Sequence, residues 1–259
     1  TKIAVAYSEE PYTLEFAAGV TNPLPTWNQA LTIYGESTPE GLQPTIIGFT
    51  MGMNPGAAEY AVTISDLKLN GNGAGYVDNV PSNAVTHISS LVIKNCEIFN
   101  YAKNIATCSD GGAELHVSGE ILFDGLTAYN INPEGTGGGD TIDFRVGTYN
   151  NLTLRNSTIY NGGRTFFYLD KNISDFTGNI VIENNTLSNV NMKTNRQGMF
   201  CVRLVDVLKG AFEVKNNLIL NILGEGQDLT KFHLVGNYDG CVTPTFANNY
   251  YYNFSNNDD

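Results

Sequence analysis

The chain has 259 residues, of which 42% are hydrophobic and only 15% charged, and it carries a formal net charge of −12. This acidic balance excludes nucleic acid and anionic membrane surfaces as expected partners, because both are bound through clusters of Lys and Arg. No run of about 18 apolar residues occurs, so no membrane-spanning helix is expected.

The N-terminal part of the chain, residues 1–60, is predicted to form irregular coils or a cap. Its short apolar segments, YTLEF (residues 12–16) and ALTIYGES (residues 30–37), are only weakly similar to the segments that follow. Residues 61–259 are predicted to form regular coils. A chain of this length with one continuous pattern is expected to be a single domain over residues 1–259.

One short pattern recurs through the regular part: an apolar run, an Asn, a second apolar run and another Asn. It is clearest in LVIKNCEIFN (91–100), LTLRNSTIYN (152–161) and FEVKNNLILN (212–221). The first Asn column, at intervals of 28 to 32 residues, comprises Asp66, Asn95, Gly125, Asn156, Asn184, Asn216 and Asn248. The second, five positions later, comprises Gly71, Asn100, Asn130, Asn161, Asn189, Asn221 and Asn253.

A fixed period of this length indicates a solenoid or another stacked array. The apolar runs are too short for helices and show no amphipathic helical pattern. We therefore predict an all-β fold, a single-stranded right-handed parallel β-helix of about 7–9 coils. The repeated Asn residues are predicted to lie at turns in the left-handed conformation and to point inward as ladders of hydrogen-bonded amides.

Segments of variable length follow the second Asn column. The long ones, residues 130–140, 189–198 and 221–231, are predicted to border a binding groove, because insertions in a solenoid gather on one face. Four strands follow such segments: TIDFRV (141–146), FFYLD (166–170), FCVRLV (200–205) and KFHLVG (231–236). They are aligned on residues expected to face inward, namely Phe144, Leu169, Val202 and Leu234.

This alignment places two columns of side chains on the outer face. One contains Asp143, Tyr168, Cys201 and His233, and the other contains Arg145, Asp170, Arg203 and Val235. Arg binds carboxylates bidentately, so Arg145, Asp170 and Arg203 are the candidate catalytic residues for an acidic sugar. The candidate substrate-binding residues are Asp143, Tyr168 and His233. The alternative is a structural ladder of opposed charges.

The only cofactor that the sequence suggests is Ca²⁺. Asp140 and Asp143, with Glu134 nearby, are weak candidates for its ligands. No spacing typical of a zinc site occurs, and a chain of this size does not need disulfides. We expect the four cysteines to be free and mostly buried: Cys96, Cys108, Cys201 and Cys241.

The coils LVIKNCEIFN, LTLRNSTIYN and VIENNTLSN (181–189) resemble those of the pectin-lyase-like superfamily of β-helix proteins. The segment at residues 30–48 is similar to the opening coils of the chondroitinase-B-like lyases. GGDTIDFRVG (138–147) and NNYYYN (248–253) are similar to an uncharacterised family of secreted bacterial β-helix proteins. The resemblance implies a secreted, periplasmic or cell-surface protein of a glycan-using bacterium. The lyases' metal and base motifs are absent as recognisable strings.

Three functions follow as hypotheses. The one we favour is a glycan-binding protein, accessory to polysaccharide utilisation, whose partner is a polysaccharide or oligosaccharide. The second is a polysaccharide lyase or glycoside hydrolase acting on an acidic glycan at Arg145, Asp170 and Arg203. The third is a structural or adhesive surface domain. We expect a monomer, and we expect Tyr250, Tyr251 and Tyr252 either to cap the open end, which we favour, or to stack against sugar rings.

Overall fold

The computed structural model describes residues 1–13, 26–108, 112–135, 139–170, 178–190, 198–203, 210–222, 234–235 and 242–254. Every regular element in these ranges is a β-strand. Nowhere in them is there a helix that could cross a membrane.

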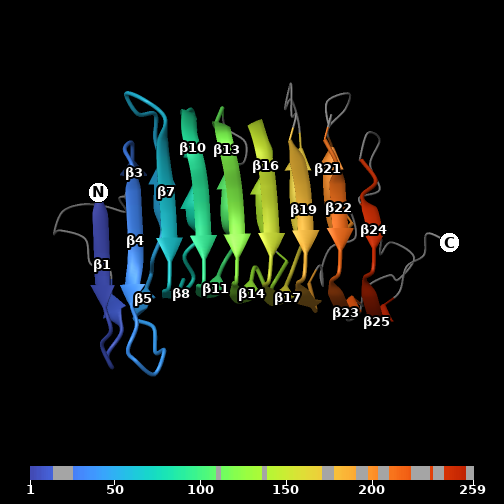
Figure 1. Cartoon of the computed structure of the whole chain (residues 1–259), viewed down its shortest axis with the longest axis horizontal. Coiled ribbons are helices and arrows are strands. Elements are labelled where there is room, and N and C mark those ends of the chain that lie inside the picture. Colours follow the sequence, from blue (N-terminus) through green and yellow to red (C-terminus); the bar gives the residue numbers. More distant parts are fainter. Residues whose placement is uncertain are drawn as a thin grey trace.

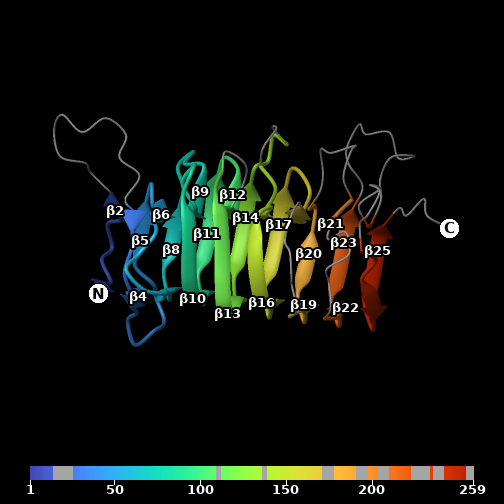
Figure 2. The same cartoon turned by 90° about the horizontal axis from the view of Figure 1, so that it is seen from above.

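The strands form three parallel sheets, and within each sheet successive strands follow one another along a single axis (Figures 1 and 2). Sheet A, seen face-on in Figure 1, comprises β1 (Lys2–Ala6), β4 (Leu31–Glu36), β7 (Tyr60–Ser65), β10 (Val85–Lys94), β13 (Glu114–Asp124), β16 (Gly147–Arg155), β19 (Asn179–Glu183), β22 (Phe212–Lys215) and β24 (Thr245–Ala247). Sheet B, labelled in the same order in Figure 2, comprises β2 (Tyr12–Thr13), β5 (Thr45–Ile47), β8 (Lys68–Asn70), β11 (Glu97–Tyr101), β14 (Thr127–Ile131), β17 (Thr158–Gly162), β20 (Thr186–Ser188), β23 (Leu218–Ile222) and β25 (Tyr250–Phe254). Sheet C comprises β3 (Thr26–Trp27), β6 (Met51–Met53), β9 (Tyr76–Asn79), β12 (Asn104–Cys108), β15 (Ile142–Phe144), β18 (Phe167–Asp170) and β21 (Phe200–Arg203).

Each turn of the chain adds one strand to each sheet, so β10, β11 and β12 form one coil and β13, β14 and β15 the next. The prediction of an all-β parallel β-helix is confirmed. Six turns, from β4 to β21, have strands of at least three residues in all three sheets. This is slightly fewer than the seven to nine coils expected, because strands β2 and β3 of the first turn have two residues each and the last two turns have no strand of sheet C among the described residues.

Parallel pairing without offset stacks equivalent residues directly above one another. The apolar residues two positions before the first Asn column therefore form one continuous inner column: Ile64, Ile93, Phe123, Leu154, Ile182, Val214 and Phe246. All of these are fully buried except Phe246, which packs against the core from the last strand of sheet A. Cys96 and Cys108 are free and buried, as predicted, Cys201 is buried, and Cys241 lies outside the described residues.

The Asn columns occupy turns with a left-handed backbone, as predicted. In the first column φ lies between 52° and 57° at Asn95, Asn156, Asn184 and Asn216. Asn reaches this region at little cost, whereas β-branched residues do not. Their side chains are exposed, however, so the prediction that they point inward is wrong. The chain bends from sheet A into sheet B at the left-handed residue, and the residue that follows it is buried against the core.

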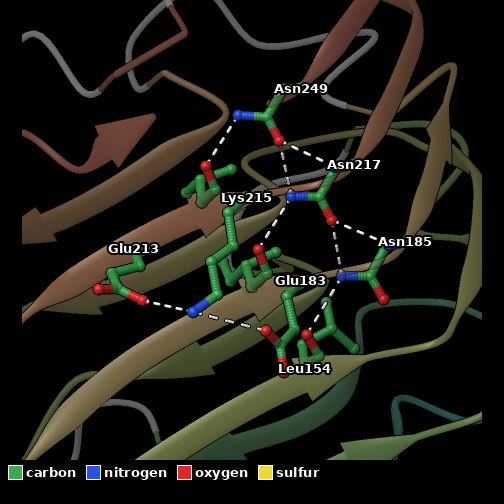
Figure 3. A network of polar contacts seen from close by, with 9 residues as sticks. Leu154, Glu183, Asn185, Glu213, Lys215, Asn217 and Asn249 are labelled. Carbon is green, nitrogen blue, oxygen red and sulfur yellow. Dashed lines mark hydrogen bonds and ion pairs between the residues drawn. The ribbon is translucent and has the colours of Figure 1, made fainter. Parts of the chain in front are cut away.

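The buried amide ladder accordingly lies one position later, at Asn185, Asn217 and Asn249 (Figure 3). Asn217 donates from Nδ2 to Ile182 O at 2.9 Å and to Asn249 Oδ1 at 3.0 Å. Its Oδ1 accepts from the backbone amide of Asn185 at 2.9 Å and from Asn185 Nδ2 at 3.0 Å. Each amide thus satisfies backbone and side-chain groups of neighbouring coils, which removes the cost of burying it.

One carboxyl group faces the core without such partners. Asp78 in β9 stands in register with Met51 and Ala106, is fully buried, and has neither carboxyl oxygen in a hydrogen bond with a described residue. Burial raises the pKa of Asp78 to about 8, and the nearby amide of Asn79 counteracts this only in part. The protonated acid is therefore the form that folding selects near neutrality.

Asn217→Leu is expected to lower the free energy of unfolding by about 2–4 kcal/mol. The reason is that the Ile182 carbonyl and the Asn185 amide become buried without partners, at about 1–3 kcal/mol each. Urea unfolding followed by circular dichroism measures the change. Asn216→Gly is the matched control, because this neighbour is exposed with φ of 55° and Gly adopts that conformation freely. Equal losses in both variants would contradict the ladder's role.

Asp78 makes stability depend on pH. Its pKa is higher in the folded than in the unfolded chain, so its contribution to folding falls as pH rises from about 4 to 8. Asp78→Asn should flatten this slope and exceed the wild type in stability at pH 9 by more than about 1 kcal/mol, since one pKa unit corresponds to about 1.36 kcal/mol. Urea midpoints measured from pH 4 to 9 test this, and an unchanged slope in the variant would refute it.

Candidate functional site

The strands that carry the predicted site are adjacent in sheet C. Asp143 in β15 lies opposite Tyr168 in β18, and Tyr168 lies opposite Cys201 in β21, as the alignment predicted. Asp170 and Arg203 are also backbone neighbours. Their side chains, and His233 as a whole, lie outside what the structure describes.

The last strand of the alignment differs from the prediction. Val235 was expected beside Arg203, but it forms an isolated bridge with Phe200. Val235 therefore stands three positions away from the column of Arg145, Asp170 and Arg203. Nothing in the sequence marks this offset, because the segment before Val235 varies in length from coil to coil.

The outer face of sheet C is covered at Asp143 and Tyr168. Both were expected to be exposed, but Asp143 has no exposed surface and Tyr168 only 3%. Part of the cover is Arg145, whose guanidinium carbon lies 5.1 Å from the centre of the Tyr168 ring. Alternation placed these side chains on the correct face of the strand, but it could not show what packs over them.

Four charged side chains, Asp140, Asp143, Arg145 and Arg164, form a charge cluster on this face. Arg145 binds Asp143 bidentately, with Nε 2.9 Å from Oδ1 and Nη2 2.9 Å from Oδ2. Arg145 Nη2 also lies 3.4 Å from Asp140 Oδ2, and Arg164 Nε lies 3.4 Å from Asp140 Oδ1. The two arginines balance the two carboxylates.

Hydrogen bonds from buried side-chain amides fix the backbone of the segment that carries the charge cluster. Asn104 in β12 donates from Nδ2 to the carbonyl of Asp140, and Asn132 donates to the carbonyl of Gly139. The backbone amide of Arg145 donates to Cys108 O at 2.9 Å. These contacts fix both ends of the segment that carries Asp140 and Asp143.

Burial dominates the protonation of the cluster. It raises the pKa of Asp143 to about 7, although the guanidinium of Arg145 lowers it. It also raises the pKa of Asp140, against the opposing effect of Arg164 and Arg145. Burial lowers the pKa of Arg145, but the neighbouring Asp143 and Asp140 carboxylates outweigh this effect and raise it above its usual range. An acid with a pKa near 7 is suited to proton transfer, but its carboxylate has no exposed surface here.

The same contacts bear on the suggested Ca²⁺ site. The carboxylate oxygens of Asp140 and Asp143 face arginine nitrogens, and Ca²⁺ requires six to eight oxygen ligands. Among the described residues, His, Cys, Asp and Glu side chains form no group of three or more that could hold a metal ion. The charge cluster is thus built as an ion-pair network.

An alternating charge column whose side chains are all described lies on the outer face of sheet A. Paired strands align Lys94, Asp124, Arg155, Glu183 and Lys215. Arg155 Nη2 is 2.8 Å from Asp124 Oδ2, and Lys215 Nζ is 3.6 Å from Glu183 Oε2, as Figure 3 shows for the latter pair. These residues immediately precede the first Asn column, so the repeat alignment contained the signal.

Sheet B carries a column of aromatic rings that the sequence analysis did not identify. Phe99, Tyr129 and Tyr160 lie opposite one another in β11, β14 and β17. Their rings stack with centroids 5.1 Å and 5.0 Å apart and planes within 8° of parallel. We call these three residues the ring column. Each immediately precedes a member of the second Asn column, a regularity that the sequence alone already displays.

Polar groups flank the ring column on the same outer face. Tyr129 Oη donates to Glu97 Oε1 at 3.0 Å, and Lys68 Nζ lies 3.0 Å from Glu97 Oε2. Burial and this hydrogen bond raise the pKa of Tyr129 to about 12. A parallel column of hydroxyls runs two residues before the rings and consists of Thr127, Thr158 and Thr186.

A hollow of about 530 Å³ adjoins the second Asn column. It is lined by Gly73, Asn100, Tyr101, Ala102, Asn130, Asn132, Pro133 and Glu134. Residues 130–134 open one of the long variable segments, so the structure places a hollow beside the segment that was predicted to border a groove. Asn100 and Asn130, which line the hollow, directly follow Phe99 and Tyr129 of the ring column.

The last strand of sheet B extends this face. Tyr250 and Tyr252 in β25 are 64% and 62% exposed, and Tyr252 stands in register with Leu220. The side chains of Tyr250 and Tyr252 lie on the outer face of sheet B, whereas Tyr251 is in register with the buried Ile219. Tyr250 and Tyr252 therefore do not cap the core, which was the alternative favoured from sequence.

Arg145→Met is expected to destabilise the fold by about 3–5 kcal/mol at pH 7, because it leaves buried carboxylates unpaired. The deficit should shrink at pH 5, where Asp143 is protonated, since its pKa lies near 7 even beside Arg145. Arg155→Met is the matched control. Its side chain is 42% exposed in the sheet A column, so its loss should cost less than about 1 kcal/mol. Thermal and urea unfolding at both pH values decide; similar losses in the two variants would refute the prediction.

Comparison with known proteins gives one match. Residues 26–162, which extend from β3 to the end of β17, match the model of a domain of unknown function, DUF4957. No curated protein and no solved structure matches the chain. The matched segment is more than half of the chain and includes Asp140, Asp143, Arg145 and the ring column. The chain is therefore a member of the DUF4957 family.

Proposed function

We propose that this protein is a secreted, periplasmic or cell-surface glycan-binding β-helix that acts as an accessory to polysaccharide utilisation. The observation that carries the proposal is the outer face of sheet B, where the half-buried rings of Phe99, Tyr129 and Tyr160 stack beside hydroxyl and amide groups. Membership of the pectin-lyase-like superfamily fits this proposal. We expect the protein to bind the glycan as a monomer.

The chemistry of this face matches that of a sugar polymer. Sugars present apolar C–H faces and many hydroxyls, so their sites combine aromatic rings with a few convergent polar groups. Here the rings lie between the threonine column and the second Asn column, and Asn100 and Asn130 of that Asn column line the hollow of about 530 Å³. The parallel sheet repeats the arrangement coil after coil, which suits a ligand that itself repeats.

Charge favours a neutral glycan over a polyanionic one. The net charge of −12 repels polyanions at long range. On the face itself Lys68 is paired with Glu97, so it leaves no excess of positive charge. Hydrogen bonds from Tyr, Thr and Asn side chains suit the hydroxyls of an uncharged polysaccharide.

A second candidate function is glycan cleavage at the charge cluster. The observation in its favour is that the pKa of Asp143 is raised to about 7 beside Arg145 and Tyr168. Such a group can exchange a proton near neutral pH. It requires that substrate binding uncover Asp143, which is fully buried in the free protein.

The test is affinity electrophoresis in gels that contain hydroxyethylcellulose, xyloglucan, galactomannan, xylan or polygalacturonate, with reducing ends assayed in parallel. The wild type is expected to be retarded by a neutral polysaccharide without releasing reducing ends. Tyr129→Ala combined with Tyr160→Ala should weaken retardation at least tenfold, equivalent to about 1.4 kcal/mol, because it removes the stacked rings.

Tyr34→Ala is the matched control, since Tyr34 is a half-buried tyrosine on the outer face of sheet A in β4. It should bind as the wild type does. No retardation on any polysaccharide, or equal retardation of all three proteins, would overturn the proposal. Release of reducing ends that Asp143→Asn abolishes would establish the second candidate instead.

A further inference from the structure

The ring column of sheet B is interrupted at one coil. After Phe99, Tyr129 and Tyr160, the next position in register is Ser188 in β20, followed by Leu220 in β23. Ser188 is thus a small side chain between two large ones on the same outer face. All three of Tyr160, Ser188 and Leu220 are half-buried and retain contact with solvent.

Among the described residues, this interruption leaves one face of Tyr160 without a stacked ring. One face of its ring stacks on Tyr129, with centroids 5.0 Å apart, and the opposite face is directed along the solenoid axis towards Ser188. No ring among the described residues stacks there. Two strand spacings separate Tyr160 from Leu220, which amounts to about 9.6 Å. A ring placed midway lies about 4.8 Å from each, close to the spacing already present in the column.

The amide ladder on the rim is interrupted at the same coil. Asn161 donates to Asn130 at 3.3 Å, and Asn253 donates to Asn221 at 2.9 Å. Between these pairs, the Asn189 side chain forms no hydrogen bond with any described residue. Its backbone keeps the left-handed turn, with φ of 52°. Asn189 therefore offers an uncommitted amide donor and acceptor beside Ser188.

We propose that this open position is the seat of a single pyranose ring. The apolar face of the sugar stacks on Tyr160 and contacts Leu220 on the other side, so it completes the column. Its hydroxyls reach Asn189 at one rim and the hydroxyls of Ser188 and Thr186 below. The polar rim distinguishes a sugar from a purely aromatic ligand, which would leave these groups unsatisfied. The inference rests on the proposed function and narrows it to one subsite.

The stacking geometry also selects among sugars. A pyranose whose substituents are all equatorial presents only ring hydrogens on both faces, whereas an axial hydroxyl, as in galactose or mannose, protrudes from one of them. Tyr160 and Leu220 lie on either side of the proposed position, so both faces of the sugar must make contact there. We therefore expect glucose- or xylose-based polymers to occupy the seat in preference to galactose- or mannose-based ones. Discrimination of this kind follows from the loss of contact area and from an unpaired hydroxyl.

The decisive experiment places an aromatic side chain of the protein itself at the proposed sugar position. In Ser188→Tyr the new ring continues the stack on Tyr160, so the variant should keep or raise its melting temperature and lose at least tenfold in retardation by hydroxyethylcellulose and xyloglucan. Ser90→Tyr is the matched control, because Ser90 lies on the outer face of sheet A in β10. It should bind as the wild type does.

A second variant tests the rim. Asn189→Gly retains the left-handed turn and removes only the amide, so it should weaken retardation severalfold at an unchanged melting temperature. Asn95→Gly, at an equivalent left-handed turn of the first column, is its control. If the wild type is retarded and Ser188→Tyr is retarded equally, the seat is refuted and glycan binding stands. If the wild type binds none of the polysaccharides, both proposals fail.

Discussion

The stacking of one coil directly on the next is the constraint on which the rest of the structure depends. Parallel strands about 4.8 Å apart bring each side chain onto the equivalent residue of the coils before and after it. Side chains therefore interact along columns, and a column is stable only if neighbouring side chains attract one another or pack well together. Apolar residues inside, opposite charges on sheet A and flat rings on sheet B are three solutions to that requirement.

Polar groups enter the interior only where the stacking supplies their partners. Asn185, Asn217 and Asn249 bond to one another and to the carbonyls of the preceding coil, so each amide is satisfied by its own repeat. The charge cluster achieves the same result with two carboxylates and two arginines. Asp78 has no such partner among the described residues, and burial raises its pKa to about 8, so the protonated acid is the form expected in the core.

The outer surfaces differ in what they leave for a ligand. On sheet A, the charges of Asp124, Arg155 and their neighbours are engaged with each other. On sheet C, the candidate residues Asp143 and Tyr168 are buried. On sheet B, the stacked rings of the ring column lie beside threonine hydroxyls and beside the Asn189 amide, which forms no hydrogen bond with a described residue. The repeat thus supplies the binding surface, and its one irregular position, Ser188, supplies a place where a ligand ring can enter.

The sequence by itself determined the parallel β-helix, because the spacing of the Asn columns and of the apolar residues before them depends only on chain-local turns. It also predicted the left-handed turn residues and the alignment of Asp143, Tyr168 and Cys201. Only the tertiary structure decided which residue after each turn faces inward, that Arg145 closes over Asp143, and that Phe99, Tyr129 and Tyr160 form one stack. These features depend on how side chains some thirty residues apart pack against each other and on which side chains bury them. A repeat pattern indicates the face of a strand on which a residue lies, but not which side chains pack over that face.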